Sequence, residues 1–195
     1  LWLGTDFGPG SLTASGYPRI VKSWRRGTLL AEASTVFESK AEDMTAAGST
    51  IFTPERSYDL VVRVPAFFQA ETYLVLGGRL VKVDVPLDAA IRGVFRDHLL
   101  VSLRSDWAVG GSTHREGSLL SIAVDDLLQG KRSFAVVFEP AARVSLAGVA
   151  TTRDRVIMTT LDNVISKMYR LTLANGAWSR EEVALPGIGS AGVAS

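Results

Sequence analysis

The sequence predicts an all-β protein made of β-propeller blades, about four of them. Extended runs are separated by turn dipeptides, most clearly Gly77-Gly78 and Asn175-Gly176. Strands that return after such breaks recur at about 40 to 50 residues, the period expected of propeller blades. They lie at Leu80–Val85, Ser118–Val124 and Lys167–Leu173. No helical pattern is long enough for a βαβ crossover, which argues against a doubly wound α/β domain. A β-sandwich with irregular repeats is the alternative.

The stretch Glu71–Val85 is the strongest local signal, because two extended runs flank Gly77-Gly78. A two-residue loop fixes the register, so that residues equally distant from the two glycines face each other. Both faces of this hairpin are substantially apolar, and we expect both to be covered. The same register places Glu71 opposite Asp84, and like charges in that position destabilise a hairpin.

The other expected strands are rich in β-branched and apolar residues and are bounded by Gly, Pro, Asn or Asp. In chain order they are Arg19–Trp24, Ala31–Phe37, Asp59–Val64, Ala66–Gln69, His98–Arg104, Ser133–Phe138, Val144–Ala150, Arg155–Leu161, Val164–Leu173 and Ala177–Val183.

The remaining local elements are short helical turns and connections. Helical turns are expected at Glu38–Ala47, stopped by Gly48, and at Asp125–Gln129, ended by Gly130. Ser105–Gly117 is expected to form a glycine-rich loop and Asp162-Asn163 a turn. Pro65, which separates two of the expected strands, suits a strand edge or a bulge. Approximate blades follow at 1–40, 41–92, 93–140 and 141–185, and 186–195 would begin the next blade.

Composition narrows the classes of function. Of the 195 residues, 47% are hydrophobic and 21% are charged, which is a globular composition. The net charge of +1 gives no reason to expect nucleic acid or an anionic membrane as a partner, and no apolar run approaches the ~18 residues of a membrane-spanning helix. The chain has no cysteine, which excludes thiolate chemistry and disulfides but leaves cytoplasm and periplasm both open.

Candidate catalytic residues are sparse. A serine hydrolase needs a serine on a strained turn and a histidine base. Ser190 lies in GIGSAG, where Ile188 occupies the position that requires the first glycine of G-x-S-x-G. The two histidines, His98 and His114, are expected at a strand start and in a loop. The sequence therefore nominates no catalytic residue.

The sequence patterns that would indicate a cofactor or metal site are incomplete as well. Gly187, Gly189 and Gly192 match the spacing of a dinucleotide-binding loop, but Pro186 precedes them and only three residues follow, so no helix can receive a pyrophosphate. Acidic pairs such as Asp125-Asp126 lack the spacing of a calcium loop. No cofactor or metal ligand is expected, and the four dispersed tryptophans are interpreted as packing residues.

One segment carries a family resemblance. Ser11–Gly27, SLTASGYPRIVKSWRRG, resembles the N-terminal β-propeller of bacterial members of the prolyl oligopeptidase family of serine peptidases. Further similar stretches are Leu80–Pro86, Leu99–Trp107, Gly117–Ile122 and Val137–Pro140. The likeness runs through nearly the whole chain, and nothing in it matches the α/β-hydrolase domain that carries the family's triad.

The resemblance implies an arc of a seven-bladed propeller that covers the active site of a catalytic domain in the same parent chain. Its implied role is to restrict access to short peptides, with the parent cleaving after proline. An open arc would expose apolar sheet faces, so the isolated chain is expected to associate with itself. The alternatives are a free-standing small propeller that serves as a protein or ligand binding scaffold and, least favoured, a catalytic propeller with a site built from loops.

Overall fold

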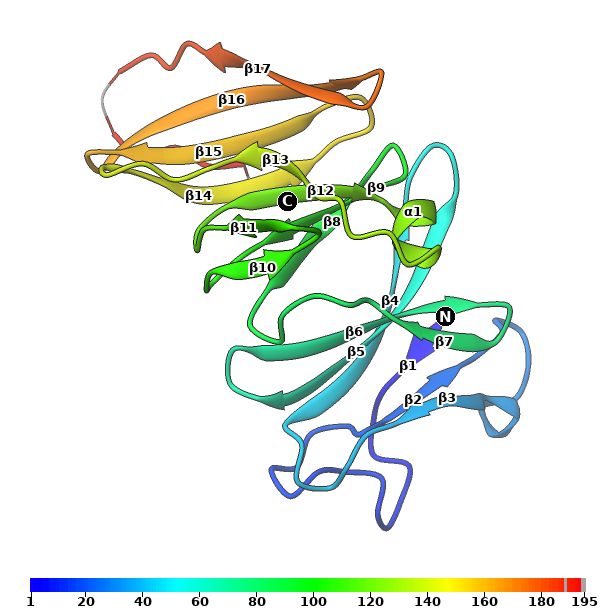
Figure 1. Ribbon diagram of the computed structural model, residues 1–195. Helices are drawn as coiled ribbons and strands as arrows, with labels where there is room; N and C mark the ends of the chain where they lie inside the picture. The colour runs from blue at the N-terminus through cyan, green and yellow to red at the C-terminus, as the bar shows by residue number, and fades with distance from the viewer. Residues whose placement is uncertain (188, 194–195) are drawn as a thin grey trace. The chain divides into compact units, whose positions relative to one another are not determined.

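The computed structural model describes residues 1–187 and 189–193, and these residues are almost entirely antiparallel β-structure (Figure 1). The predicted all-β class is confirmed. Within the described part of the chain there are three four-stranded sheets, each an antiparallel meander as in a propeller blade, and one of them is interrupted by an inserted hairpin. The expected start of a further blade at 186–195 lies partly outside the described residues.

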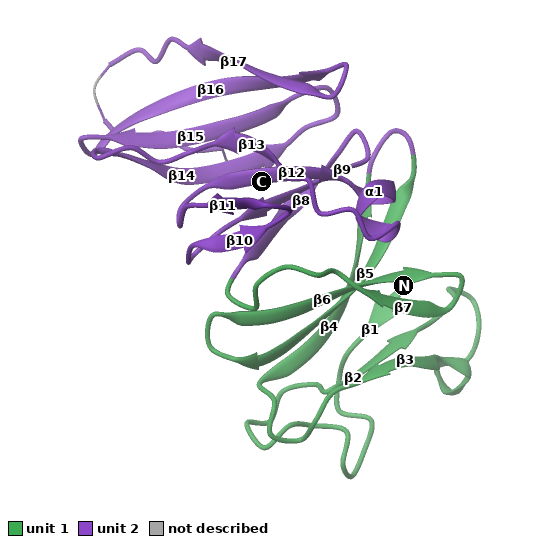
Figure 2. Cartoon of the chain, viewed as in Figure 1, with its two compact units in different colours: residues 1–52, 56–88 green, residues 53–55, 89–195 purple. Residues whose placement is uncertain are grey.

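The chain divides into two compact units (Figure 2). The first comprises residues 1–52 and 56–88, and the second comprises residues 53–55 and 89–195. Each unit contains sheets that pack through apolar faces, and each is described by itself below.

The first unit holds a three-stranded sheet and a four-stranded sheet. The three-stranded sheet is formed by β1 (Trp2–Leu3), β2 (Ile20–Ser23) and β3 (Ser34–Glu38), with a 3₁₀ turn at Leu30–Glu32. The four-stranded sheet is formed by β4 (Thr45–Phe52), β5 (Ser57–Ala66), β6 (Gln69–Leu76) and β7 (Arg79–Lys82).

Apolar side chains from both sheets form the core of this unit. Val21, Ala46 and Val61 are buried at its centre. Phe37 of β3 meets Tyr73 of β6 with ring centroids 5.4 Å apart. Packing of one sheet face on another accounts for the apolar alternation in the sequence.

The expected Glu71–Val85 hairpin is confirmed in its turn and register. Tyr73 pairs with Lys82 and Leu76 with Arg79. Gly77 and Gly78 have φ of 54° and 79°, the left-handed region that glycine enters without steric cost.

The second unit holds two four-stranded sheets and an inserted hairpin. One sheet contains β8 (Ala90–Phe95), β9 (His98–Ser102), β12 (Leu119–Ala123) and β13 (Ala135–Phe138), with the short helix α1 (Val124–Leu128) between its last two strands. The hairpin of β10 (Trp107–Val109) and β11 (Ser112–His114) connects β9 to β12. The other sheet contains β14 (Val144–Thr151), β15 (Val156–Asp162), β16 (Ile165–Ala174) and β17 (Ala177–Val183).

These two sheets also pack face to face. Phe95, Leu100, Leu119 and Phe138 of the first sheet share one buried cluster with Val156, Met158, Leu171 and Leu173 of the second. Phe95 and Trp178 bring their ring centroids to 5.9 Å at the edge of this cluster. The Arg96 guanidinium donates to the carbonyl of Leu173 at 3.1 Å, which joins the sheets by a polar contact as well.

Several local predictions are wrong. Glu38–Ala47 forms no helix: residues 39–44 form a loop, and β4 begins at Thr45. The Asp43 carboxylate accepts a hydrogen bond from the Lys40 amide at 2.9 Å, which holds the backbone in a turn instead.

The irregularity expected at Pro65 is present, but the strand expected after it is not. Strand β5 continues through Pro65, with a shift in register between Arg63 and Ala66, and the chain turns at Phe67-Phe68. The predicted strand Ala66–Gln69 is therefore wrong, because aromatic residues occupy a turn that they normally avoid.

Two connections are shifted or more ordered than expected. Asp162 pairs with Ile165, so the two-residue turn is Asn163-Val164 rather than Asp162-Asn163. The supposed loop Ser105–Gly117 contains the β10–β11 hairpin. The helical turn expected at Asp125–Gln129 is confirmed in place by α1.

Candidate functional site

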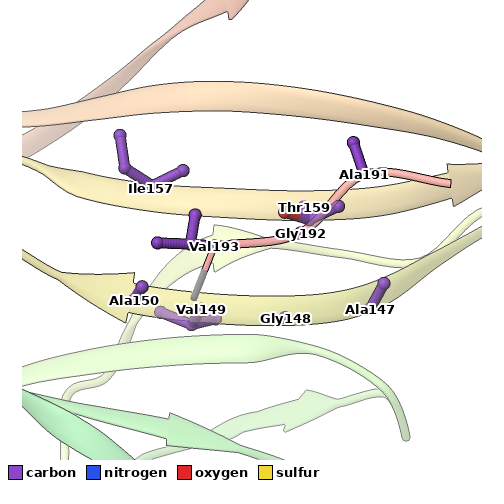
Figure 3. Close-up of a pocket in the computed structure, with 9 residues that line it drawn as sticks. All are labelled: Ala147, Gly148, Val149, Ala150, Ile157, Thr159, Ala191, Gly192 and Val193. Atoms are coloured by element: carbon purple, nitrogen blue, oxygen red, sulfur yellow. The ribbon is translucent and has the colours of Figure 1, made fainter. Parts of the chain in front are cut away.

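A hollow of about 220 Å³ lies on one face of the β14–β17 sheet, beneath the segment Ala191–Val193 (Figure 3). Side chains alternate along a strand, so Ile157 and Thr159 of β15 point away from Val156 and Met158, which pack on the β8–β13 sheet. The hollow thus lies on the opposite face. Its lining residues are Ala147, Gly148, Val149, Ala150, Ile157, Thr159, Ala191, Gly192 and Val193.

Two hydrogen bonds with Ser166 hold the covering segment in place. The Ser166 amide donates to the Gly189 carbonyl at 3.2 Å, and the Ala191 amide donates to the Ser166 hydroxyl at 3.0 Å. Apart from the Thr159 hydroxyl, the hollow is lined by apolar side chains and backbone. With no ionisable side chain, it can accommodate extended main chain but offers no general acid or base.

A wider groove of about 840 Å³ lies elsewhere in the second unit. It is lined by Asp106, Arg115, Glu116, Gly117, Pro140, Ala141, Ala142 and Ser145. The Glu116 amide donates to Asp106 Oδ1 at 2.8 Å, which fixes the connection that leads into β12. Charged side chains line one part of this groove, and Pro140, Ala141 and Ala142 line another part.

The densest group of charges lies in the first unit, around Arg63 of β5. Its Nε and Nη2 donate to the two carboxylate oxygens of Asp43, each at 2.8 Å, and its Nη1 donates to Glu71 Oε2 at 2.8 Å. Glu71 also accepts hydrogen bonds from the Tyr73 hydroxyl and the Lys82 ammonium. We call these five residues the Arg63 cluster.

The sequence predicted that Glu71 would face Asp84 and be repelled by it. In the structure Glu71 belongs to the Arg63 cluster. The ladder between β6 and β7 ends at the pair Tyr73–Lys82. Glu71 is paired instead with Arg63 across the β5–β6 ladder, where it meets opposite charge.

The pKa shifts in this cluster favour ionised carboxylates and a neutral Tyr73 hydroxyl. Hydrogen bonding from Lys82, followed by Arg63 and Tyr73, lowers the pKa of Glu71 to about 2. Hydrogen bonding from Arg63 lowers the pKa of Asp43, and burial raises the pKa of the Tyr73 hydroxyl. Carboxylates held in the ionised form are poor proton donors near neutral pH, so the cluster acts as a clamp between the 39–44 loop and the β4–β7 sheet.

The residues weighed for hydrolase chemistry lie on separate elements. His98 opens β9, with its Nδ1 2.9 Å from the Arg96 carbonyl. His114 ends β11, is buried, and pairs with Trp107. Ser190 lies in the exposed C-terminal segment. Within the described residues, no hydrogen bond joins any two of them.

The glycine pattern weighed for dinucleotide binding lies in the C-terminal segment. Ile188 of the Gly187-x-Gly189-x-x-Gly192 pattern lies outside the described residues, and Gly189–Val193 contains no helix. Within residues 1–187 and 189–193, no group of three acidic or histidine side chains is placed to hold a metal ion. In the same ranges no helix has the length and apolar character needed to cross a membrane.

Trp2 and Trp107 pack against neighbouring residues. Trp2 lies over Gly48 and donates to the Thr50 hydroxyl at 2.9 Å. Trp107 meets Phe134 edge to face, with ring centroids 4.8 Å apart.

The Arg63 cluster was not predicted from the sequence. A usable signal was present, because a strand register that pairs Arg63 with Glu71 would have shown opposite charges facing each other. The expectation of two separate strands around Pro65 concealed that register.

Comparison with known proteins gives relatives that are all longer. No family model matches the sequence. An uncharacterized peptidase from Rickettsia prowazekii is 30% identical over 179 residues, which cover 87% of this chain and 25% of that protein. An uncharacterized peptidase from Sinorhizobium fredii is 26% identical over 195 residues, which cover 95% of this chain and 27% of that protein. This chain therefore spans about a quarter of the length of the curated relatives that it matches.

Solved structures that match this fold are also much longer than this chain. A post-proline cleaving enzyme from Rickettsia typhi matches with a TM-score of 0.85 and 28% identity, over 93% of this chain and 28% of that enzyme. A structure from a study of two prolyl endopeptidases matches with a TM-score of 0.64 over 94% of this chain and 26% of that one; at 14% identity it supports the fold alone. These matches confirm the predicted fold of β-propeller blades.

Proposed function

We propose that this chain is the non-catalytic propeller portion of a serine endopeptidase of the prolyl oligopeptidase family, because it is similar to about a quarter of the length of longer peptidases. In this role the blades form part of an arc of a seven-bladed propeller. They cover the active site of an α/β-hydrolase domain in the same parent chain and admit only short peptides. The parent cleaves after proline.

One observation carries this proposal. Almost the whole chain, 93% of it, matches 28% of a solved post-proline cleaving enzyme with a TM-score of 0.85. The match leaves most of that enzyme outside the aligned region, which leaves room for a separate catalytic domain.

The chemistry of the described residues supports a steric role. The hollow on the β14–β17 sheet has no ionisable lining, and the Arg63 cluster holds its carboxylates ionised. Sheets packed through buried apolar clusters make a stiff wall, because close-packed interiors resist compression. A stiff wall excludes large substrates by size.

The test compares the full-length parent protein with residues 1–195 alone. The parent is expected to hydrolyse a short fluorogenic peptide after proline and to leave a folded protein of similar composition uncut. The 1–195 chain is expected to hydrolyse neither substrate and to self-associate in light scattering as concentration rises. Cleavage of the peptide by 1–195 alone would refute the non-catalytic assignment.

A substitution in the propeller portion tests whether the packed sheets limit the length of the substrate independently of the catalytic step. In the parent, Trp178→Ala weakens the packing of the β14–β17 sheet on Phe95 and leaves the hydrolase domain unchanged. We expect unchanged cleavage of the short peptide but faster cleavage of longer peptides. If the length limit stays the same, the packed sheets do not set it.

A further inference from the structure

The sheet that opens the first unit is one strand short of a propeller blade. Among the described residues, β1, β2 and β3 form a three-stranded sheet, whereas the β4–β7, β8–β13 and β14–β17 sheets each have four strands. Propeller blades are four-stranded. Residues 39–44 lead from β3 directly into β4, the first strand of the next sheet, so a fourth strand would lie beside β1.

The lengths of the connections identify β1 as the second strand of its blade. In the four-stranded sheets the first and second strands are joined by only two to four residues, at 53–56, 96–97 and 152–155. Longer connections within these sheets follow the second or the third strand. Residues 4–19 join β1 to β2, which is as long as the connection 103–118 between the second and third strands β9 and β12. The first strand of this blade therefore precedes β1 in chain order.

The backbone of Trp2 presents an open edge to such a strand. The Leu1 amine donates to the Trp24 carbonyl and the Trp24 amide donates to the Leu1 carbonyl, each at 2.9 Å. Hydrogen-bonded and non-hydrogen-bonded pairs alternate along an antiparallel ladder, so the N–H and C=O of Trp2 point away from β2. In the part of the chain that the structure describes, no strand pairs with β1 on that side. An unpaired edge of this kind is a template for another strand.

Contacts within the first unit hold this edge in position. The Trp2 ring lies over Gly48 of β4, and its Nε1 donates to the Thr50 hydroxyl at 2.9 Å. Leu1 lies on the opposite face of the strand and is 60% exposed, so apolar surface beside the edge is left for a partner to cover. A strand that adds here pairs with an edge that is already ordered, which lowers the entropic cost of pairing.

We propose that the edge of β1 pairs with a strand formed by the parent polypeptide immediately before Leu1, and that this strand completes the blade. The inference rests on one part of the proposed function, namely that these blades belong to a longer chain. The relatives have the length for such a segment, because the matched regions cover only 25% and 27% of them. The short connections between first and second strands place the end of the added strand two to four residues before Trp2.

Hydrogen exchange at the Trp2 amide of the full-length parent tests the proposal, with the Leu80 amide of the edge strand β7 as reference. The Val83 amide donates to the Thr72 carbonyl, and alternation from this pair turns the Leu80 amide away from β6. After correction for intrinsic rates, Trp2 is expected to exchange at least about a hundredfold more slowly than Leu80, because ladder amides exchange only when the strands open. Equal rates would overturn the proposal.

Two further measurements identify the strand that protects Trp2. Protection that falls when the parent is diluted would mean that a second copy supplies the strand, and the proposal would be wrong. In a parent variant that lacks every residue before Leu1, Trp2 should exchange as fast as Leu80. The Val61 amide should stay protected in this variant, because β5 is paired on both sides. If Trp2 stays protected as well, another segment pairs with it and the proposal is wrong.

The truncated variant remains informative if it unfolds and Val61 also exchanges fast. A synthetic peptide of the deleted residues next to Leu1 should then restore protection at Trp2 and Val61. Failure of the peptide to restore protection would count against the proposed strand.

The inference and the proposed function fail separately. If the parent cleaves short proline peptides while Trp2 exchanges as fast as Leu80, only the added strand is refuted. If Trp2 is protected but the parent has no such activity, the added strand stands and the proposed function is wrong.

Discussion

Arg63 and Asp43 form a two-pronged ion pair, with two donor–acceptor distances of 2.8 Å, across 20 residues of sequence. The Asp43 side chain is only 3% exposed and that of Arg63 is 21% exposed. This pair attaches the loop before β4 to the middle of β5.

Replacing Arg63 should therefore destabilise the first unit. Arg63→Met leaves the Asp43 carboxylate buried without its cation, and we expect the free energy of unfolding to fall by about 3 to 5 kcal/mol. Lys131→Met removes an exposed ion pair with Asp126 and should change little. Urea unfolding of both variants measures the difference, and similar effects would contradict a clamp at Arg63.

The pH dependence of stability should report Glu71. Its pKa falls from 4.5 to about 2 in the folded protein, chiefly through the hydrogen bond from Lys82. A depressed folded pKa contributes stability that is present above the unfolded pKa and is lost as pH falls through the folded pKa. The free energy of unfolding should thus decrease by about 3 kcal/mol between pH 5 and pH 2 on account of this group.

Glu71→Gln should flatten that part of the pH profile in urea unfolding at a series of pH values. Glu181→Gln, at a carboxylate whose side chain is 69% exposed, serves as the control and should leave the slope nearly unchanged. A profile that Glu71→Gln does not alter would show that the cluster adds nothing to acid stability.

Alanine at two glycines in equivalent strands should have opposite effects. A Cβ at Gly48 of β4 would lie 2.7 Å from the Trp2 ring, so Gly48→Ala is expected to cost about 1 to 3 kcal/mol. A Cβ at Gly148 of β14 would meet no atom within 4 Å, so Gly148→Ala should be neutral or slightly stabilising. Thermal unfolding of the two variants gives the comparison, and a stable Gly48→Ala protein would mean that Trp2 moves without cost.

The φ angles at Gly77 and Gly78 predict which substitutions this hairpin turn tolerates. Gly77→Asn creates the Asn-Gly sequence that the chain already uses at Asn175-Gly176, so stability should be unchanged. Gly78→Val places a β-branched residue at φ of 79° and should cost about 1 to 2 kcal/mol. Equal melting temperatures for the two variants would refute a turn-specific requirement.

The sequence was sufficient for the fold class because local signals agreed with one another. The Gly77-Gly78 turn, the apolar alternation on both sides of it and the strand period all pointed to meandering sheets, and the register Tyr73–Lys82 followed directly. Errors arose where tertiary contacts overrode a local pattern. Asp43 turned a helix-like segment into a loop through a partner 20 residues away, which local propensity cannot show.

The site was harder to predict than the fold. The Arg63 cluster depends on a strand that continues through Pro65, and the exposed turn Phe67-Phe68 resembles a strand by composition. The blade boundaries expected from the sequence stay a prediction.

Strand connectivity also governs how the chain can fold. In the described part of every sheet, neighbours in space are neighbours in sequence, and only the β10–β11 hairpin interrupts this order. The loops that join paired strands are therefore short in nearly all cases. Short loops lower the entropic cost of closure, which favours fast formation of each sheet. A chain emerging from the ribosome can complete the β4–β7 sheet before β14 has been synthesised, so the unpaired edges that promote aggregation are exposed only briefly.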